Sequence, residues 1–394
     1  MRADRISVDV WHTFLVNRND TATGEQSGGL LLLLTTLVAL LWANSPWHAT
    51  YAPLWHASVT LGRGSTSVSV SLLGVINNGL MAVFFLLLGV GIRRDATDGP
   101  LVSPRQAVLP VAAAVGGIVT PALFYLALNA GRPGAAGWGI PMATDPAFAL
   151  GLLALLGRRV PPALCGILAA LAVVDDIAAV VVIAAVYHAG IDGISLLLSA
   201  AVVAVLVAVA RAGVRHPSVY ATLGGILWLA TLRAGVSPTI AGVLLALALP
   251  APAVPWLERV LSRPVSVLIV PLFALANAGI TVGHGWPAAL AAPVTLGVAV
   301  GLVLGKQVGI TLGAWLAVRS GIALLPPGLR WRHIYGIGWL GGLGFTTALF
   351  IANLAFGDTA PLVAAKLGVL VAGIVAGIGG CVLLFFGGPE RARA

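Results

Sequence analysis

The chain has 394 residues, of which 59% are hydrophobic and only 9% are charged, and its mean hydropathy is +1.01. Soluble domains carry roughly 25% charged residues, so this composition excludes a soluble protein. The formal net charge of +9 comes mainly from Arg residues scattered in ones and twos between apolar runs, and this pattern excludes a basic nucleic-acid-binding surface.

Twelve apolar segments follow a polar N-terminal segment, residues 1–27, in which we find no cleavable signal sequence. Most are about 17–25 residues long, enough to cross a bilayer as helix. The segments are 28–44, 72–91, 107–129, 138–156, 163–187, 194–211, 218–233, 237–250, 265–283, 290–318, 334–356 and 363–386. The eighth is short, and the ninth can begin earlier, near Trp256. We predict an all-α polytopic membrane protein of about twelve transmembrane helices, with a single transporter domain, 28–386, and a short tail, 387–394.

The basic residues are distributed unevenly between the two sides of this arrangement. When the loops are assigned to alternate sides, most of the 22 Lys and Arg residues fall on the side of the two termini. The other side has four, namely Arg63, Arg132, Arg233 and Lys366. Positively charged loops stay in the cytoplasm, so we expect both termini to be cytoplasmic.

Four ionisable side chains remain at membrane depth: Asp145, Asp175, Asp176 and Lys306. Ionised carboxylates in lipid cost roughly 2.5–3.5 kcal/mol each, so the adjacent pair indicates a cation or proton pathway. Adjacent helical residues differ by about 100° in direction, so the two carboxylates cannot both face one point. Lys306 can pair with Asp175, either as a structural ion pair or as a functional one. Asp176 has no obvious partner, which favours a functional role for it.

Asp145 lies in the sequence Ile140–Phe148, which contains Pro141, Thr144 and Pro146. Two prolines in the middle of a span favour a broken helix, because proline removes backbone hydrogen bonds. The oxygens of Thr144 and Asp145 can then cap the second half-helix or coordinate an ion. A helix that is only kinked, with an ordinary N-cap, is the alternative.

The eleventh segment carries a similar interruption at Gly341, Gly342, Gly344 and Phe345. Glycines weaken a helix, although they also permit close helix packing. The two breaks occupy corresponding positions in two three-helix groups, approximately 107–187 and 290–386. Such paired interruptions are typical of inverted-repeat secondary transporters, whose binding site lies where the breaks cross.

No other chemistry is indicated by the sequence. There is no Walker GxxxxGK[ST] loop, and we expect no cofactor and no enzymatic activity. The histidines show no metal-ligand spacing and are expected at solvated or interfacial positions: His12, His48, His56, His188, His216, His284 and His333. Cys165 and Cys381 are expected to be small buried residues.

At these residues the chain resembles the NhaA family of sodium/proton antiporters, from Ser27 to Gly368. The matching segments are Asn78–Phe85, Ala143–Asp145, Val174–Asp176, Pro271–Gly279, Gly305–Lys306 and Gly344–Thr346. The resemblance implies that Asp176 is the principal Na⁺/H⁺-exchanging carboxylate and that Asp175 is also needed for transport. It implies that Lys306 pairs with Asp175, that Asp145 offsets helix-end dipoles, and that Thr144 lies near the ion.

The chain departs from the family pattern at residues linked to pH response. Asn78 and Gly91 stand where the family often has an Asp and a Glu, and Ser237 replaces a His of the best-studied member. Asp95 keeps one acid of the pH-sensing cluster, and Glu258 is a further candidate. The resemblance therefore predicts exchange more firmly than it predicts the pH profile.

The function expected from this resemblance is electrogenic export of cytoplasmic Na⁺ or Li⁺ in exchange for external protons, in a bacterial inner membrane. The transported ions and the lipid bilayer are the expected partners, with no nucleic acid, and a homodimer remains an option. A passive cation channel and a carrier of organic anions on a related inverted-repeat fold are the alternatives. Adding Na⁺ to vesicles with an imposed pH gradient separates these classes.

Overall fold

The computed structural model describes residues 28–61, 68–97, 104–157, 160–188, 190–281, 286–326 and 328–386. The N-terminal segment 1–27 and the tail 387–394 lie outside the described residues. The chain divides into two compact units. Unit 1 takes in Asp95–Ala179 and His284–Ala394, and unit 2 takes in Leu30–Arg94 and Val180–Gly283.

Unit 1 contains both of the three-helix groups that the sequence analysis singled out. Its elements are α5 (Pro104–Asn129), the 3-10 helix η3 (Pro133–Met142), α6 (Pro146–Leu156), most of α7 (Pro162–Val186), α13 (Trp286–Leu290), α14 (Pro293–Val300), the π-helix η6 (Gly301–Gly305), α15 (Lys306–Arg319), α16 (Trp331–Gly341), α17 (Phe345–Phe356) and α18 (Ala360–Phe386). Proline begins five of these elements, where its missing N–H costs no intrahelical hydrogen bond.

Unit 2 contains the remaining helices. They are most of the helix Gly28–Ala43, α2 (His48–His56), α3 (Leu72–Gly74), the π-helix η2 (Val75–Leu80), most of α4 (Met81–Thr97), α8 (Gly193–Arg211), α9 (Pro217–Arg233), α10 (Thr239–Ala248), α11 (Ala253–Pro264), the π-helix η5 (Val265–Ile269) and α12 (Val270–Asn277). Asp192 caps α8 by accepting a hydrogen bond from the Ser195 N–H. Hydrogen bonds from the Ser195 side chain and backbone lower the pKa of Asp192.

Each of the twelve predicted segments coincides with helix among the described residues. Seven helices are long and apolar enough to span a membrane, and three bent helix pairs raise this number to ten. The other two segments correspond to α9, with 17 residues, and α10, with 10 residues. The ninth segment begins at Ala253, in agreement with the earlier start near Trp256.

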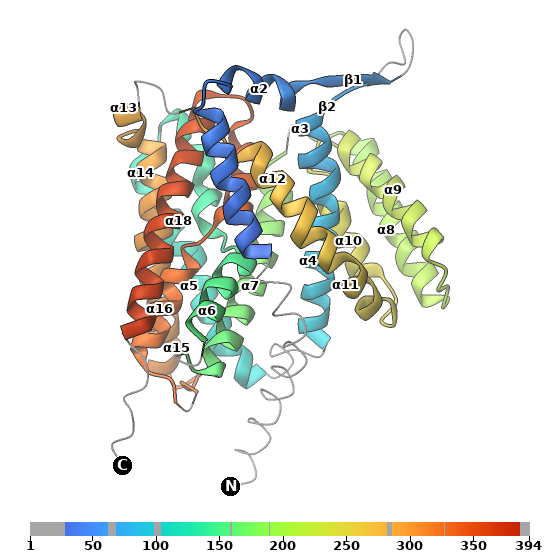
Figure 1. The fold of residues 1–394 in the computed structure, drawn as a ribbon. Helices are drawn as coiled ribbons and strands as arrows, with labels where there is room; N and C mark the ends of the chain where they lie inside the picture. Colours follow the sequence, from blue (N-terminus) through green and yellow to red (C-terminus); the bar gives the residue numbers. More distant parts are fainter. Residues whose placement is uncertain are drawn as a thin grey trace. The chain divides into compact units, whose positions relative to one another are not determined.

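A short antiparallel hairpin in unit 2 was not predicted from the sequence. Strand β1 (Ser58–Leu61) pairs with β2 (Val68–Ser71), in the register Ser58 to Ser71 and Leu61 to Val68. The hairpin links α2 to α3 (Figure 1). The chain is otherwise helical over its described residues, so the all-α class holds apart from this pair of strands.

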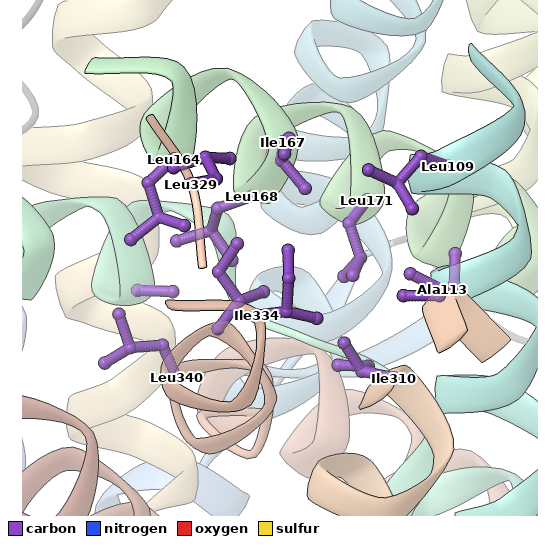
Figure 2. Packing of buried hydrophobic residues seen from close by; sticks show 14 of the residues in the cluster. Leu109, Ala113, Leu164, Ile167, Leu168, Leu171, Ile310, Leu329, Ile334 and Leu340 are labelled. Carbon is purple, nitrogen blue, oxygen red and sulfur yellow. The ribbon is translucent and has the colours of Figure 1, made fainter. Parts of the chain in front are cut away.

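The core of unit 1 is an apolar cluster between α5, α7, α15 and α16. Figure 2 shows leucines of α7 facing Ile334 and Leu340 of α16, with Leu109 of α5 and Ile310 of α15 alongside. All four of these named side chains are buried. This packing fixes α7 and α15, the two helices that carry Asp175, Asp176 and Lys306, within one rigid cluster.

Helices α5 and α15 lie side by side in unit 1 at unusually close range (Figure 1). A Cβ atom on Gly309 would meet the backbone carbonyl of Gly116 and would lie 2.9 Å from the Cβ of Thr120. A Cβ atom on Gly116 would meet the carbonyl of Gly309. Glycine is therefore required on both helices, because only a missing side chain lets the two backbones approach this closely.

We expect Gly309→Ala to lower the thermal stability of the protein. Forcing a methyl group into a packed interface costs about 1–3 kcal/mol, and here the obstacle is backbone. Gly373→Ala in α18 is the matched control, since a Cβ at Gly373 has nothing within 4 Å. Melting temperatures in detergent test this prediction. Equal melting temperatures for the two variants would contradict it.

Candidate functional site

Two interrupted helices meet inside unit 1. The first consists of η3 and α6, with a break over residues 143–145 and a bend of 43°. The second consists of α16 and α17, with a break over residues 342–344 and a bend of 45°. Both breaks lie where the prolines and glycines predicted them. Pro146 begins α6 as its first residue, and Gly341 is the last residue of α16.

The two breaks hydrogen-bond to each other in both directions. The Asp145 N–H donates to the Leu343 carbonyl at 2.6 Å, and the Thr346 N–H donates to Asp145 Oδ2 at 3.1 Å. Thr346 Oγ1 also donates to Oδ2, at 2.5 Å, and the Phe148 N–H donates to Oδ1 at 3.2 Å. The Asp145 carboxyl group thus caps the first turns of both α6 and α17, where helix dipoles favour negative charge.

Apolar contacts close this crossing. The rings of Phe148 in α6 and Phe345 in α17 lie 6.0 Å apart between centroids. A Cβ atom on Gly344 would lie 2.7 Å from the Ala143 carbonyl oxygen, so glycine is needed where the two breaks pass. A Cβ atom on Gly342 would likewise lie too close to the Leu302 carbonyl oxygen. These close contacts show that glycine at Gly342 and Gly344 shapes the crossing.

Asp175 and Lys306 form a buried ion pair between α7 and α15. Lys306 Nζ lies 2.5 Å from Asp175 Oδ2, and both side chains are 0% exposed. Lys306 follows directly after the π-helix η6, and its N–H donates to the Gly301 carbonyl five residues earlier. The wider π turn changes the direction of the Lys306 side chain relative to that in a regular α-helix. Single π turns within helices are often found at functional sites.

Thr144 connects this ion pair to the second broken helix. Its Oγ1 lies 2.6 Å from Asp175 Oδ2 and 2.9 Å from the carbonyl oxygen of Gly341, at the end of α16. A hydroxyl group has one proton to donate, and both of these neighbours accept when Asp175 is ionised. If Asp175 is protonated, it can donate to Thr144, and the Thr144 proton is then available for Gly341. Thr144 thereby couples the protonation of Asp175 to the end of α16.

Asp176 differs from Asp145 and Asp175 because no hydrogen bond joins its carboxyl group to the part of the chain that the structure describes. The residue is 7% exposed, and its Oδ1 has no hydrogen-bond partner among the described residues. Oδ1 of Asp175 is likewise without a partner among them. Buried carboxylate oxygens without donors are costly unless a proton or a cation satisfies them.

The arrangement offers hard oxygen ligands in the interior of α7. Carboxylate, hydroxyl and carbonyl oxygens suit small hard cations, and Asp176, Asp175 and Thr144 supply the first two types. The oxygens of Asp145, by contrast, already accept three backbone or side-chain donors at Thr346 and Phe148. Among the described residues there is no group of three His, Cys, Asp or Glu side chains placed to hold a metal ion.

The candidate pH-response residues are divided between the two units. Asp95 belongs to unit 1 and is buried, whereas Glu258 in unit 2 forms an ion pair with Arg94. Asn78 lies in η2, where its carbonyl accepts a hydrogen bond from Trp228 Nε1 at 2.8 Å. Ser237 is buried, and its hydroxyl lies 2.7 Å from the hydroxyl of Thr239.

Two expectations about other side chains need correction. His333, expected at a solvated or interfacial position, is 5% exposed, and its Nδ1 accepts a hydrogen bond from the Arg330 N–H at the start of α16. This capping role explains its burial, because the first N–H groups of a helix need acceptors. Cys165 and Cys381, expected to be buried, are of intermediate exposure.

Sequence reasoning named Gly341 only as a helix-break residue and Thr346 only as part of a matching family segment, and it predicted no contact for either in the site. Thr346 lies two residues after one helix break, and Asp145 is the last residue of the other break. The Thr346 hydroxyl donates a hydrogen bond to the Asp145 carboxyl group. Their contact spans 201 residues of sequence, so a local pattern could not reveal it. A threonine beside each break was the available signal.

Comparisons with known proteins agree with the resemblance noted above. The sequence matches the family model described as Na⁺/H⁺ antiporter 1 over residues 19–384. The Na⁺/H⁺ antiporter NhaA of Oleidesulfovibrio alaskensis is 45% identical over 411 residues, covering 91% of each protein. That of Rhodospirillum rubrum is 44% identical over 375 residues, covering 91% of this chain and 94% of the relative. The solved sodium proton antiporter MjNhaP1 of Methanocaldococcus jannaschii has a TM-score of 0.48 and 14% identity, over 97% of this chain and 96% of that chain.

Proposed function

The chain belongs to the Na⁺/H⁺ antiporter 1 family, and on that premise we propose that it exports cytoplasmic Na⁺ in exchange for external protons through Asp176. The observation that carries this proposal is the unpartnered carboxyl oxygen of Asp176 inside unit 1, next to the Asp175–Lys306 pair. A carboxyl group in that position binds a proton or a cation but not both.

Competition at this site is sufficient to couple the two fluxes. When the site is open to one side of the membrane at a time, Na⁺ binding displaces protons on one side and proton binding displaces Na⁺ on the other. No ATPase is needed, because the proton gradient supplies the free energy. We propose Li⁺ as a second cation on the family resemblance, with Thr144 and Asp175 as neighbouring oxygen ligands and Asp145 as the cap that holds the crossing.

Electrogenic exchange is part of the proposal. If the site binds more protons than cations in each cycle, net charge crosses the membrane. Asp175 and Asp176 provide two titratable carboxyl groups for such a cycle. We place the protein in a bacterial inner membrane with both termini cytoplasmic, on the distribution of Arg and Lys between the loops. Monomer and homodimer both remain compatible with this mechanism.

The test uses purified protein in liposomes with an imposed pH gradient. Adding Na⁺ to the outside is expected to dissipate the gradient, and a membrane potential is expected to change the rate if exchange is electrogenic. Sodium flux that proceeds without proton movement would assign a channel instead. A requirement for a large organic substrate would assign an organic-anion carrier.

The pH response is expected to follow simple competition. Protonated Asp176 cannot bind Na⁺, so the apparent Na⁺ affinity should fall as the pH falls, by at most about tenfold per pH unit for one competing proton. Measuring the apparent KM for Na⁺ across pH tests this slope. A sharp switch over a narrow pH interval would contradict it and direct attention to Asp95, Glu258, His216 and His333.

Gly91→Glu offers a matched gain-of-function variant for the same measurement. A Cβ at Gly91 has nothing within 4 Å, so α4 can accept a larger side chain there. The added acid stands where family members often carry one, and it is expected to make the pH dependence steeper. An unchanged slope in this variant would show that position 91 alone does not confer regulation.

A further inference from the structure

A groove of about 560 Å³ lies between α16 and α18. Its lining residues are Arg332, Trp339, Gly379, Val382, Leu383 and Phe386. Both helices belong to unit 1. Arg332 is the only charged residue of this lining, and the other lining residues are apolar apart from the indole N–H of Trp339. A water-filled cavity would have a more polar lining.

The groove runs from the end of a span toward its interior. Arg332 is the second residue of α16, and Phe386 is the last residue of α18, so the two mark the same end of two antiparallel helices. Trp339 lies seven residues further along α16, about 10 Å deeper. Val382 and Phe386 are 50% and 81% exposed, so the groove opens on the surface that a transmembrane helix presents to lipid.

The floor of the groove depends on a glycine. A Cβ atom on Gly379 would collide with the six-membered ring of Trp339, so only glycine allows the indole to lie against α18. The indole Nε1 is buried and has no hydrogen-bond partner among the described residues. Buried indole N–H groups usually find an acceptor, and this indole belongs to a side chain that lines the groove.

We propose that this groove binds one anionic phospholipid. The phosphate would lie against the Arg332 guanidinium, whose planar fork matches phosphate oxygens. An acyl chain would lie over Val382 and Leu383. Arg330, the residue before α16, is exposed at the same end and would attract anionic lipid to the groove.

A lipid in this position would contact the half-helix that shapes the ion site. Helix α16 begins with the arginine of the groove and ends at Gly341, whose carbonyl faces the hydroxyl of Thr144. Lipid binding would therefore hold the first half of one broken helix against α18. Binding itself does not depend on the proposed ion exchange, and the experiment below measures binding alone.

The experiment titrates the purified full-length protein with phosphatidylglycerol or phosphatidylcholine of the same acyl chains and counts bound lipids by native mass spectrometry. Wild-type protein is expected to bind one phosphatidylglycerol in preference to phosphatidylcholine. Arg332→Gln is expected to weaken that binding about fivefold, the effect of one basic residue at an anionic surface. Arg319→Gln is the control, because Arg319 is exposed at the same end but does not line the groove.

A second variant tests the apolar half of the groove. Val382→Trp fills the groove from its exposed side and is expected to lower phosphatidylglycerol binding without changing the charge. Equal phosphatidylglycerol affinities in Arg332→Gln and Arg319→Gln would overturn the proposal. Phosphatidylcholine binding as strong as that of phosphatidylglycerol in wild-type protein would overturn it as well.

Discussion

Asp176→Asn is expected to reduce Na⁺-induced proton movement to the level of protein-free liposomes. The amide keeps the shape of the carboxyl group but neither takes up a proton nor carries the charge that attracts Na⁺. Because the Asp176 Oδ1 has no partner among the described residues, the substitution breaks no hydrogen bond recorded there. Proton movement on Na⁺ addition to proteoliposomes, followed with a pH-sensitive dye, is the measurement.

The stability of the same variant separates a lost site from a misfolded protein. A buried carboxylate without a partner is costly, so its amide is expected to melt at the same temperature as the wild type or higher. Asp192→Asn is the matched control, since Asn also caps helices well and Asp192 lies at the start of α8. Full residual exchange in a folded Asp176→Asn protein would remove Asp176 from the mechanism.

Lys306→Gln is expected to lower thermal stability while leaving electrogenic exchange in place. Removing one partner of a buried ion pair costs about 3–5 kcal/mol, because the other charge remains buried and uncompensated. Lys306 and Asp175 fit this case, since both side chains are 0% exposed. The melting temperature and the response of exchange to membrane potential are measured on the same preparation.

The double variant Asp175→Asn with Lys306→Gln completes the test. It removes both charges, so most of the stability lost in Lys306→Gln is expected to return. The opposite pattern has a different meaning. A stable Lys306→Gln protein whose exchange no longer responds to membrane potential would identify Lys306 as a carrier of a transported proton rather than a structural partner of Asp175.

The positions of the helices could be predicted from the sequence because hydropathy and length act locally. The same holds for the two breaks, since Pro146 and the glycines at 341, 342 and 344 act on their own helices. The β1–β2 hairpin escaped prediction because its strands are only four residues long. Strands this short give too few residues for an alternating pattern to stand out.

The contacts within the site could be predicted only in part. Lys306 was an obvious partner for an acid because intramembrane cations are rare, although 131 residues separate it from Asp175. Spacing alone fixes only that Asp175 and Asp176 differ in direction, so the pairing of Lys306 with Asp175 was a choice that the family resemblance then supported. The capping of both α6 and α17 by Asp145 could not be predicted from the sequence. A helix break shows which backbone N–H groups lose their partners, but it does not show which distant acceptor binds them.

The mutual hydrogen bonds between the two breaks have a mechanical consequence. The Asp145 backbone N–H donates to the Leu343 carbonyl, and the Asp145 side chain accepts from Thr346. Each break is therefore hydrogen-bonded to the other in both directions. Separating the two breaks would remove the Thr346 donors from the Asp145 carboxyl group and would leave the first turn of α17 without its cap. We therefore expect the four half-helices to move as one body. A rearrangement that changes which side of the membrane Asp176 faces would then have its hinge outside this crossing.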